Sequence, residues 1–220
     1  MKSLHPDRKA FEADPLGYSA IAWQKWELAQ FVATGKDSGA RDPAPADLKN
    51  PLLWLTQAHA LSEAATVVLR HTPGWESMPV WVRSACDSQY CAAGLMLVGY
   101  SLEVALKAML ILRYGVDAYT EEEKKYQHHK LDRLAEFLPD LGQKDRAILR
   151  ALTHYIEWTG RYPDPGGGRE AKFEEVFSLS EKHRIAGRDL FALAARVMKY
   201  ASVVVEESLG KDTEETSAAP

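Results

Sequence analysis

The fold is decided by residues 92–112, AAGLMLVGYSLEVALKAMLIL, a segment long and apolar enough for either a membrane span or a core helix. Glu103 and Lys107 lie near its middle. A charged side chain at the centre of a span costs about 2.5–3.5 kcal/mol, so a buried helix with one polar patch explains the segment with less strain. Its apolar residues recur every three or four positions, as in a helix packed into a core. These are Leu95, Val98, Leu102, Ala105, Met109 and Leu112.

The segments on both sides of this stretch also have helical patterns. Asn50-Pro51 indicates a helix start, because Asn caps free amide groups and Pro suits the first helical position. This helix is expected to end at 71–74, and further helices are expected at 81–113, 129–137, 143–158 and 185–209. No strand pattern and no internal repeat is visible. We therefore predict an all-α fold, an antiparallel up-and-down bundle of four long helices plus one short helix, with an N-terminal helical arm.

The chain is expected to have three parts. Residues 1–50 form an arm with one short helix at 11–32 and a linker at 34–50 that is rich in Gly, Pro, Asp and Ala. Residues 51–209 form the helical bundle, interrupted by a Gly- and Pro-rich loop at 163–168. The polar tail, residues 210–220, is expected to be disordered.

Composition narrows the classes of function. The 220 residues carry a formal net charge of −4, whereas affinity for nucleic-acid phosphates rests on Lys and Arg. Contact with a nucleic acid would therefore need a local basic patch. The first seven residues lack the apolar run of a signal peptide, so a cytoplasmic protein without a membrane segment is expected.

The cysteines and histidines do not predict a metal site. Cys86 and Cys91 are too few and wrongly spaced for a zinc ribbon or a redox pair, and their apolar neighbours favour buried, reduced thiols. His128 and His129 are adjacent, so on a helix they would point in different directions. No cofactor and no metal are expected.

The helix at 143–158 carries the candidate chemistry. At 100° per residue its inner stripe is Ile148, Leu152 and Tyr155, and the opposite face points at solvent or at a partner. That opposite face consists of Arg146, Arg150, His154 and Glu157. A histidine titrates near neutral pH and can act as a general acid or base, while an arginine can hold a phosphate. The alternative is a solvated helix face with a ladder of charges.

Glu103 and Lys107 form a second candidate group. Their i,i+4 spacing is that of an ordinary helical ion pair, worth a few tenths of a kcal/mol. Because the helix around them is apolar, half-buried charges there need partners. The basic face of the helix at 143–158 is one candidate partner, and a simple position at the edge of the bundle is the alternative.

Three motifs together resemble the HEPN superfamily of small helical-bundle proteins. The segment at 100–110 looks like the family's long helix with its Glu-x-x-x-Lys pattern. The segment at 129–134 is similar to the short His-x-Leu helix that follows, and Arg161-Tyr162-Pro163 looks like the close of the next helix. The resemblance covers residues 52–207 and leaves out the first 50.

The resemblance implies a four- or five-helix bundle that is often a homodimer. Many members are metal-independent ribonucleases of toxin–antitoxin or antiviral defence systems, and others bind nucleotides or pair with a nucleotidyltransferase. In the ribonucleases an Arg and a His with four to six residues between them line the dimer cleft. Here three residues separate Arg150 from His154, and seven separate Arg146 from His154. The Arg-Tyr-Pro form is commoner in members associated with nucleotidyltransferases.

Three hypotheses follow from these patterns. The first is a non-catalytic module that binds a nucleotide, an RNA or a partner protein such as a cognate nucleotidyltransferase or antitoxin, with Glu103, Lys107, Arg161 and Tyr162 as binding residues. The second is a metal-independent ribonuclease that uses His154 with Arg150 or Arg146 at a dimer cleft. The third is a structural helical homodimer. The departure from the ribonuclease spacing favours the first hypothesis over the second.

Overall fold

The computed structural model describes residues 5–35, 42–168 and 171–217, with side chains in the last helix described as far as Glu206. Within these ranges every regular element is a helix, which confirms the predicted all-α class. The chain divides into two compact units, Met1–Leu53 and Trp54–Pro220.

The first unit contains three consecutive short helices where one helix was expected. These are α1 (Arg8–Ala13), α2 (Pro15–Ala20) and α3 (Ala22–Thr34), and a single turn, α4 (Pro45–Leu48), follows. The first break lies at Asp14, because a residue before proline is disfavoured in helical conformation. The Asp14 carboxylate instead caps α2 by accepting a hydrogen bond from the Gly17 amide at 2.9 Å. Residues 36–41 of the predicted linker lie outside the described residues.

Helix α6 (Arg83–Tyr114) is the central element of the second unit. It is preceded by α5 (Pro51–Arg70), which begins at the predicted proline, and the Asn50 side chain accepts a hydrogen bond from the Leu52 amide at 2.9 Å. The Ser101 hydroxyl donates to the Ala58 carbonyl at 2.8 Å and joins α6 to α5. The apolar stripe of α6 is buried, with Leu102, Ala105 and Met109 at most 1% exposed.

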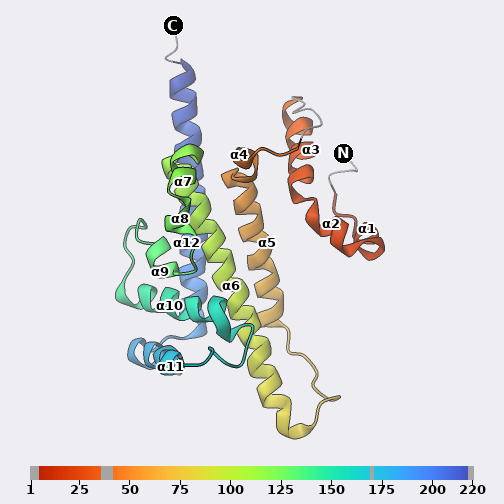
Figure 1. Cartoon of the computed structure of the whole chain (residues 1–220), viewed down its shortest axis with the longest axis vertical. Coiled ribbons are helices and arrows are strands. Elements are labelled where there is room, and N and C mark those ends of the chain that lie inside the picture. Colours follow the sequence, from red (N-terminus) through yellow and green to blue (C-terminus); the bar gives the residue numbers. More distant parts are fainter. Residues whose placement is uncertain (1–4, 36–41, 169–170, 218–220) are drawn as a thin grey trace. The chain divides into compact units, whose positions relative to one another are not determined.

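Helix α12 (Gly187–Ser217) packs along α6 on another side. Figure 1 shows the two helices running in the same direction, with α5 opposite to both, and α10 (Gln143–His154) lying crosswise to them. The prediction of antiparallel up-and-down neighbours is therefore wrong for the pair α6 and α12. The residues between α6 and α12 form short helices and crossing helices, so the chain runs back toward the starting end of α6 before α12 begins.

Several boundaries differ from those predicted. The expected helix at 129–137 is only one turn, α9 (Leu131–Leu134), and the charged run before it forms α7 (Val116–Glu121) and α8 (Glu123–Tyr126). Helix α12 continues to Ser217, where a disordered tail was expected from residue 210, and residues 218–220 lie outside the described part. A further helix, α11 (Ala171–His183), was not predicted.

Helix α10 continues into a π-helical turn, η3 (Tyr155–Thr159), which packs tightly against α6. Two glycines allow this approach. A Cβ atom on Gly99 of α6 would lie 2.7 Å from Ile156 Cγ1, and one on Gly160 would overlap the Cβ atom of Met96. The crossing of η3 over α6 therefore depends on the absence of a side chain at both positions.

The long apolar helix remains a candidate membrane span by length and composition alone. The helical segment Val80–Tyr114 passes such a test, and 61% of its most apolar window is buried inside the protein. That burial is the pattern of a core helix. The first turns of α6 are more exposed, and they carry the half-buried Cys86 and the exposed Cys91 as free thiols. The expectation that both thiols are buried is therefore wrong.

Candidate functional site

The structure brings together two of the three motifs singled out in the sequence. The Glu103 carboxylate, only 6% exposed, lies on α6 and contacts Lys107 and His129 through its two oxygens. Its Oε1 atom is 2.7 Å from Lys107 Nζ, and its Oε2 atom is 2.8 Å from His129 Nδ1. A buried carboxylate needs such partners. Of the two alternatives expected for this pair, the one with a partner on α10 is wrong, because His129 comes from the segment just before α9.

The Glu103 contact orients the His129 ring. An ionised carboxylate only accepts hydrogen bonds, so His129 Nδ1 carries a proton and donates to Oε2. Nε2 is then the ring nitrogen without a hydrogen bond to the described residues, on a side chain that is 46% exposed. The edge of the ring packs against Tyr100, with 6.1 Å between ring centroids.

Further cations lie around this pair. Burial lowers the pKa of His128, and the nearby charges of Lys107, Lys130 and Arg133 lower it further. The Lys130 amide donates to His128 Nδ1 at 3.1 Å and holds the ring in the loop before α9. Leu131 at the start of α9 is anchored to α10, because its amide donates to Thr153 Oγ1 at 3.1 Å. We call the group that consists of Glu103, Lys107, His128, His129, Lys130 and Arg133 the Glu103 site.

His154, the predicted catalytic residue, lies in a different environment. It is 7% exposed, so the prediction that it shares a solvent-facing surface with Arg146 and Arg150 is wrong. Its Nε2 atom is 3.2 Å from Glu175 Oε2, and its Nδ1 atom accepts a hydrogen bond from Trp158 Nε1 at 3.4 Å. Both ring nitrogens are therefore occupied. Glu175 belongs to α11, the helix that the sequence did not reveal.

Burial lowers the pKa of His154 and outweighs the opposing effect of the Glu175 charge, while Lys172 lowers the pKa further. Trp158 closes the site from the other side and packs edge-on against Phe173, with 4.7 Å between ring centroids. A neutral ring with two occupied nitrogens cannot exchange protons with a substrate without first opening the contact to α11. We call His154, Trp158 and Glu175 the His154 site.

Glu157 lies on η3 and contacts Lys172 of α11. Burial raises the pKa of Glu157, but the hydrogen bond and the charge of Lys172 outweigh burial, so the pKa is lowered. The Glu157 carboxylate is 2.7 Å from Lys172 Nζ.

The remaining predicted residues lie at the surface. Arg146 and Arg150 are exposed on α10, as predicted, and within the described ranges neither forms an ion pair. Arg161 donates to the Glu157 carbonyl and lies over the ring of Tyr162, which is 58% exposed. The Arg161-Tyr162 pair therefore lies one helical turn after Glu157. In the part of the chain that the structure describes, no cluster of three metal-ligating side chains is present.

Comparisons with protein-family models, with curated proteins and with solved structures found no match to this chain.

Proposed function

We propose that this protein is a non-catalytic HEPN-like module that binds a phosphate-bearing ligand, a nucleotide or an RNA, at the Glu103 site. The observation that carries the proposal is the cluster of three cationic side chains, Lys107, Lys130 and Arg133, around His128. Glu103 is the buried carboxylate of the site, and both its oxygens are already occupied by Lys107 and His129. Lys130 and Arg133 are exposed beside it and lower the pKa of His128. A phosphate would pair with the two exposed cations, Lys130 and Arg133.

The negative net charge of the chain is compatible with this proposal, since a local basic patch suffices for phosphate contact. Arg150 on α10 and the Arg161-Tyr162 pair after η3 are also exposed, and they would supply further contacts to a ligand longer than one nucleotide. The resemblance to the HEPN superfamily adds that the module works as a cytoplasmic homodimer, in a toxin–antitoxin or defence system with a cognate nucleotidyltransferase or antitoxin. A purely structural homodimer is the reading that remains if no anion binds.

The proposal is tested by titrating the protein with ATP, with adenosine and with a short single-stranded RNA at low salt. ATP and RNA should bind, and adenosine should not. The double variant Lys130→Ala/Arg133→Ala should weaken binding about tenfold and reduce the salt dependence by about two charges. The charge-matched control is Arg188→Ala/Lys199→Ala, which removes two exposed cations from α12.

A spectroscopic readout separates binding from a general loss of structure. A bound phosphate should raise the pKa of His128 because it offsets the charges that lower that pKa. Histidine NMR resonances report this change directly. Equal weakening by the control variant, or an unchanged His128 titration in the presence of ATP, would argue against the Glu103 site as the place of binding.

One observation favours a different candidate, general acid–base chemistry at His129. Its Nδ1 atom is fixed by a buried carboxylate and its Nε2 atom is accessible, which is the arrangement that supports a histidine in proton transfer. His154 lacks that access. A metal-free RNA cleavage assay on the wild type, His129→Gln and His154→Gln decides between the two. The non-catalytic proposal expects background cleavage from all three proteins, whereas cleavage lost only in His129→Gln would replace it with a ribonuclease.

A further inference from the structure

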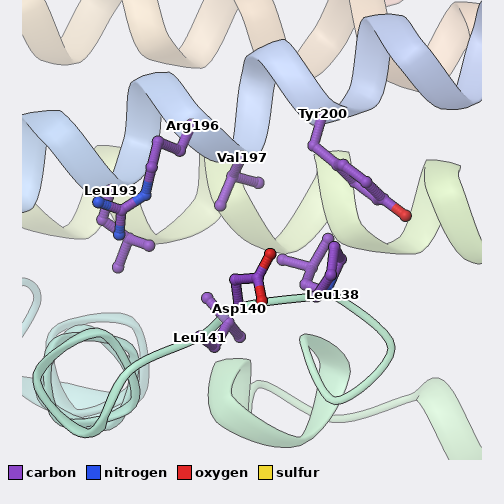
Figure 2. Close-up of a pocket in the computed structure, with 8 residues that line it drawn as sticks. Leu138, Asp140, Leu141, Leu193, Arg196, Val197 and Tyr200 are labelled. Atoms are coloured by element: carbon purple, nitrogen blue, oxygen red, sulfur yellow. The ribbon is translucent and has the colours of Figure 1, made fainter.

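A small cavity lies between α12 and the loop that joins α9 to α10, away from the Glu103 site. Its volume is about 210 Å³. Figure 2 shows the two walls, residues 138–141 on one side and one face of α12 on the other. The floor is apolar and is made of Leu138, Leu141, Leu193 and Val197, of which all but Leu141 are buried.

Asp140 is the charged group of the loop wall. Its φ of +59° is unusual for a residue other than glycine, although Asp and Asn tolerate it better than most. Figure 2 shows its carboxylate directed toward α12. Within the described ranges this carboxylate accepts no hydrogen bond and forms no ion pair. The loop therefore holds a solvent-exposed carboxylate, without a partner among the described residues, at the mouth of an apolar space.

The one cation in the lining does not neutralise Asp140. Arg196 forms its ion pair with Asp145 at the start of α10, and Figure 2 shows its guanidinium turned along α12 toward Leu193. Tyr200 completes the rim one turn further along α12, and an aromatic ring is a favourable neighbour for a cation. The cavity thus combines an unpaired carboxylate, an aromatic ring and an apolar floor.

We propose that this cavity is a binding site for an organic cation with an apolar body, an aryl- or alkylammonium group. The ammonium group would pair with the Asp140 carboxylate beside the Tyr200 ring, and the apolar body would cover the leucine and valine floor. The size is suitable, since an apolar cavity of about 150 Å³ accommodates benzene and this one leaves room for a short arm. The cation can be a free amine or a basic side chain of a partner protein, because both offer the same chemistry.

The test is an NMR titration of the full chain with phenethylamine, with its neutral counterpart phenethyl alcohol and with the anion hydrocinnamate. Phenethylamine should bind in roughly the millimolar range, with shift changes confined to residues 138–141 and 193–200. The alcohol should bind about three- to fivefold more weakly, as expected for an exposed charge pair, and the anion more weakly still.

Asp140→Asn is the matched variant, because asparagine has the same shape, tolerates the same backbone conformation and lacks the charge. It should reduce the affinity for phenethylamine to that for the alcohol, while Asp87→Asn, at an exposed position on α6, should leave it unchanged. An acetylated Phe-Lys dipeptide amide that binds more tightly than phenethylamine would identify a partner's basic segment as the source. Equal affinity for amine and alcohol, or no saturable binding of the amine, would overturn the proposal.

Discussion

Two histidine–carboxylate pairs lie near each other in this protein with opposite burial. In the Glu103 site the carboxylate is buried and the His129 ring is 46% exposed as a side chain. In the His154 site the ring is buried and the Glu175 carboxylate is 49% exposed. The two histidine–carboxylate pairs therefore have different roles. The exposed ring presents a nitrogen to the surface, whereas the buried ring fastens α11 to α10.

The largest expected effect is that of Glu103→Ala. The substitution leaves Lys107, whose side chain is 14% exposed, without its partner in an apolar environment. Loss of one member of a buried ion pair should lower the free energy of unfolding by about 3 kcal/mol, as measured by urea denaturation. Glu63→Ala, an exposed site on α5, is the control and should change it by less than about 0.5 kcal/mol.

A second variant shows why Glu103→Ala destabilises. Glu103→Leu combined with Lys107→Met replaces the charged pair by apolar side chains, and such replacements often preserve stability. Recovery of most of the lost free energy would assign the loss to the unpaired Lys107 charge. A double variant as unstable as Glu103→Ala would show instead that Glu103 and Lys107 do not behave as a buried ion pair. The contrast between the Glu103 site and the His154 site would then not hold.

An intermediate effect is expected from pH at the His154 site. Burial lowers the pKa of His154 in the folded state, so the unfolded chain binds the proton more readily. The contribution of His154 to stability is fully present above about pH 6.5, the ordinary pKa of a histidine. This contribution is lost as the pH falls through that value toward the lower pKa of the folded state. Urea midpoints measured from pH 7.5 to 5 should fall in the wild type and fall less in His154→Gln.

Other groups can be separated from this pH effect. His128 also has a lowered pKa and contributes in the same direction, so the double variant His128→Gln/His154→Gln should have the flattest profile. Glu157 has a pKa lowered from its ordinary value of 4.5, and its stabilisation is lost only at more acidic pH. If the urea midpoint of His154→Gln falls with pH as steeply as that of the wild type, the His154 ring is solvated rather than buried.

The smallest expected effect is that of Glu175→Gln. Its carboxylate is half exposed, and exposed ion pairs contribute about 0–1 kcal/mol. The variant should therefore lower the free energy of unfolding by less than about 1 kcal/mol, well below the effect of Glu103→Ala. Hydrogen exchange of the α11 amides gives a second readout, since a weaker fastening should increase their exchange rates first. A loss comparable to that of Glu103→Ala would remove the distinction between the two pairs.

The local signals in the sequence were sufficient for much of the fold. The helical pattern of α6 and the cap at Asn50 both concern residues within a few positions of one another, and both are confirmed. The direction of α12 relative to α6 depends instead on the lengths and paths of several connections, which no short pattern encodes.

In the candidate site, too, only the contacts between residues close in the sequence could be predicted. The i,i+4 pair of Glu103 and Lys107 could be predicted, but His129 is 26 residues away from Glu103 and meets it only through the tertiary fold. The error at His154 arose from the missed helix α11. Its apolar residues Phe173, Val176 and Leu179 follow one another at intervals of three, a weak signal within a charged segment. Because α11 covers His154, a helical wheel of α10 alone placed that ring in solvent.

The glycine-lined crossing of η3 over α6 has a mechanical consequence. With no side chain at Gly99 or Gly160, the backbones sit too close for α10 to slide or roll on α6 without overlap. Because η3 directly follows His154, the crossing also fixes the position of the His154 site along α6.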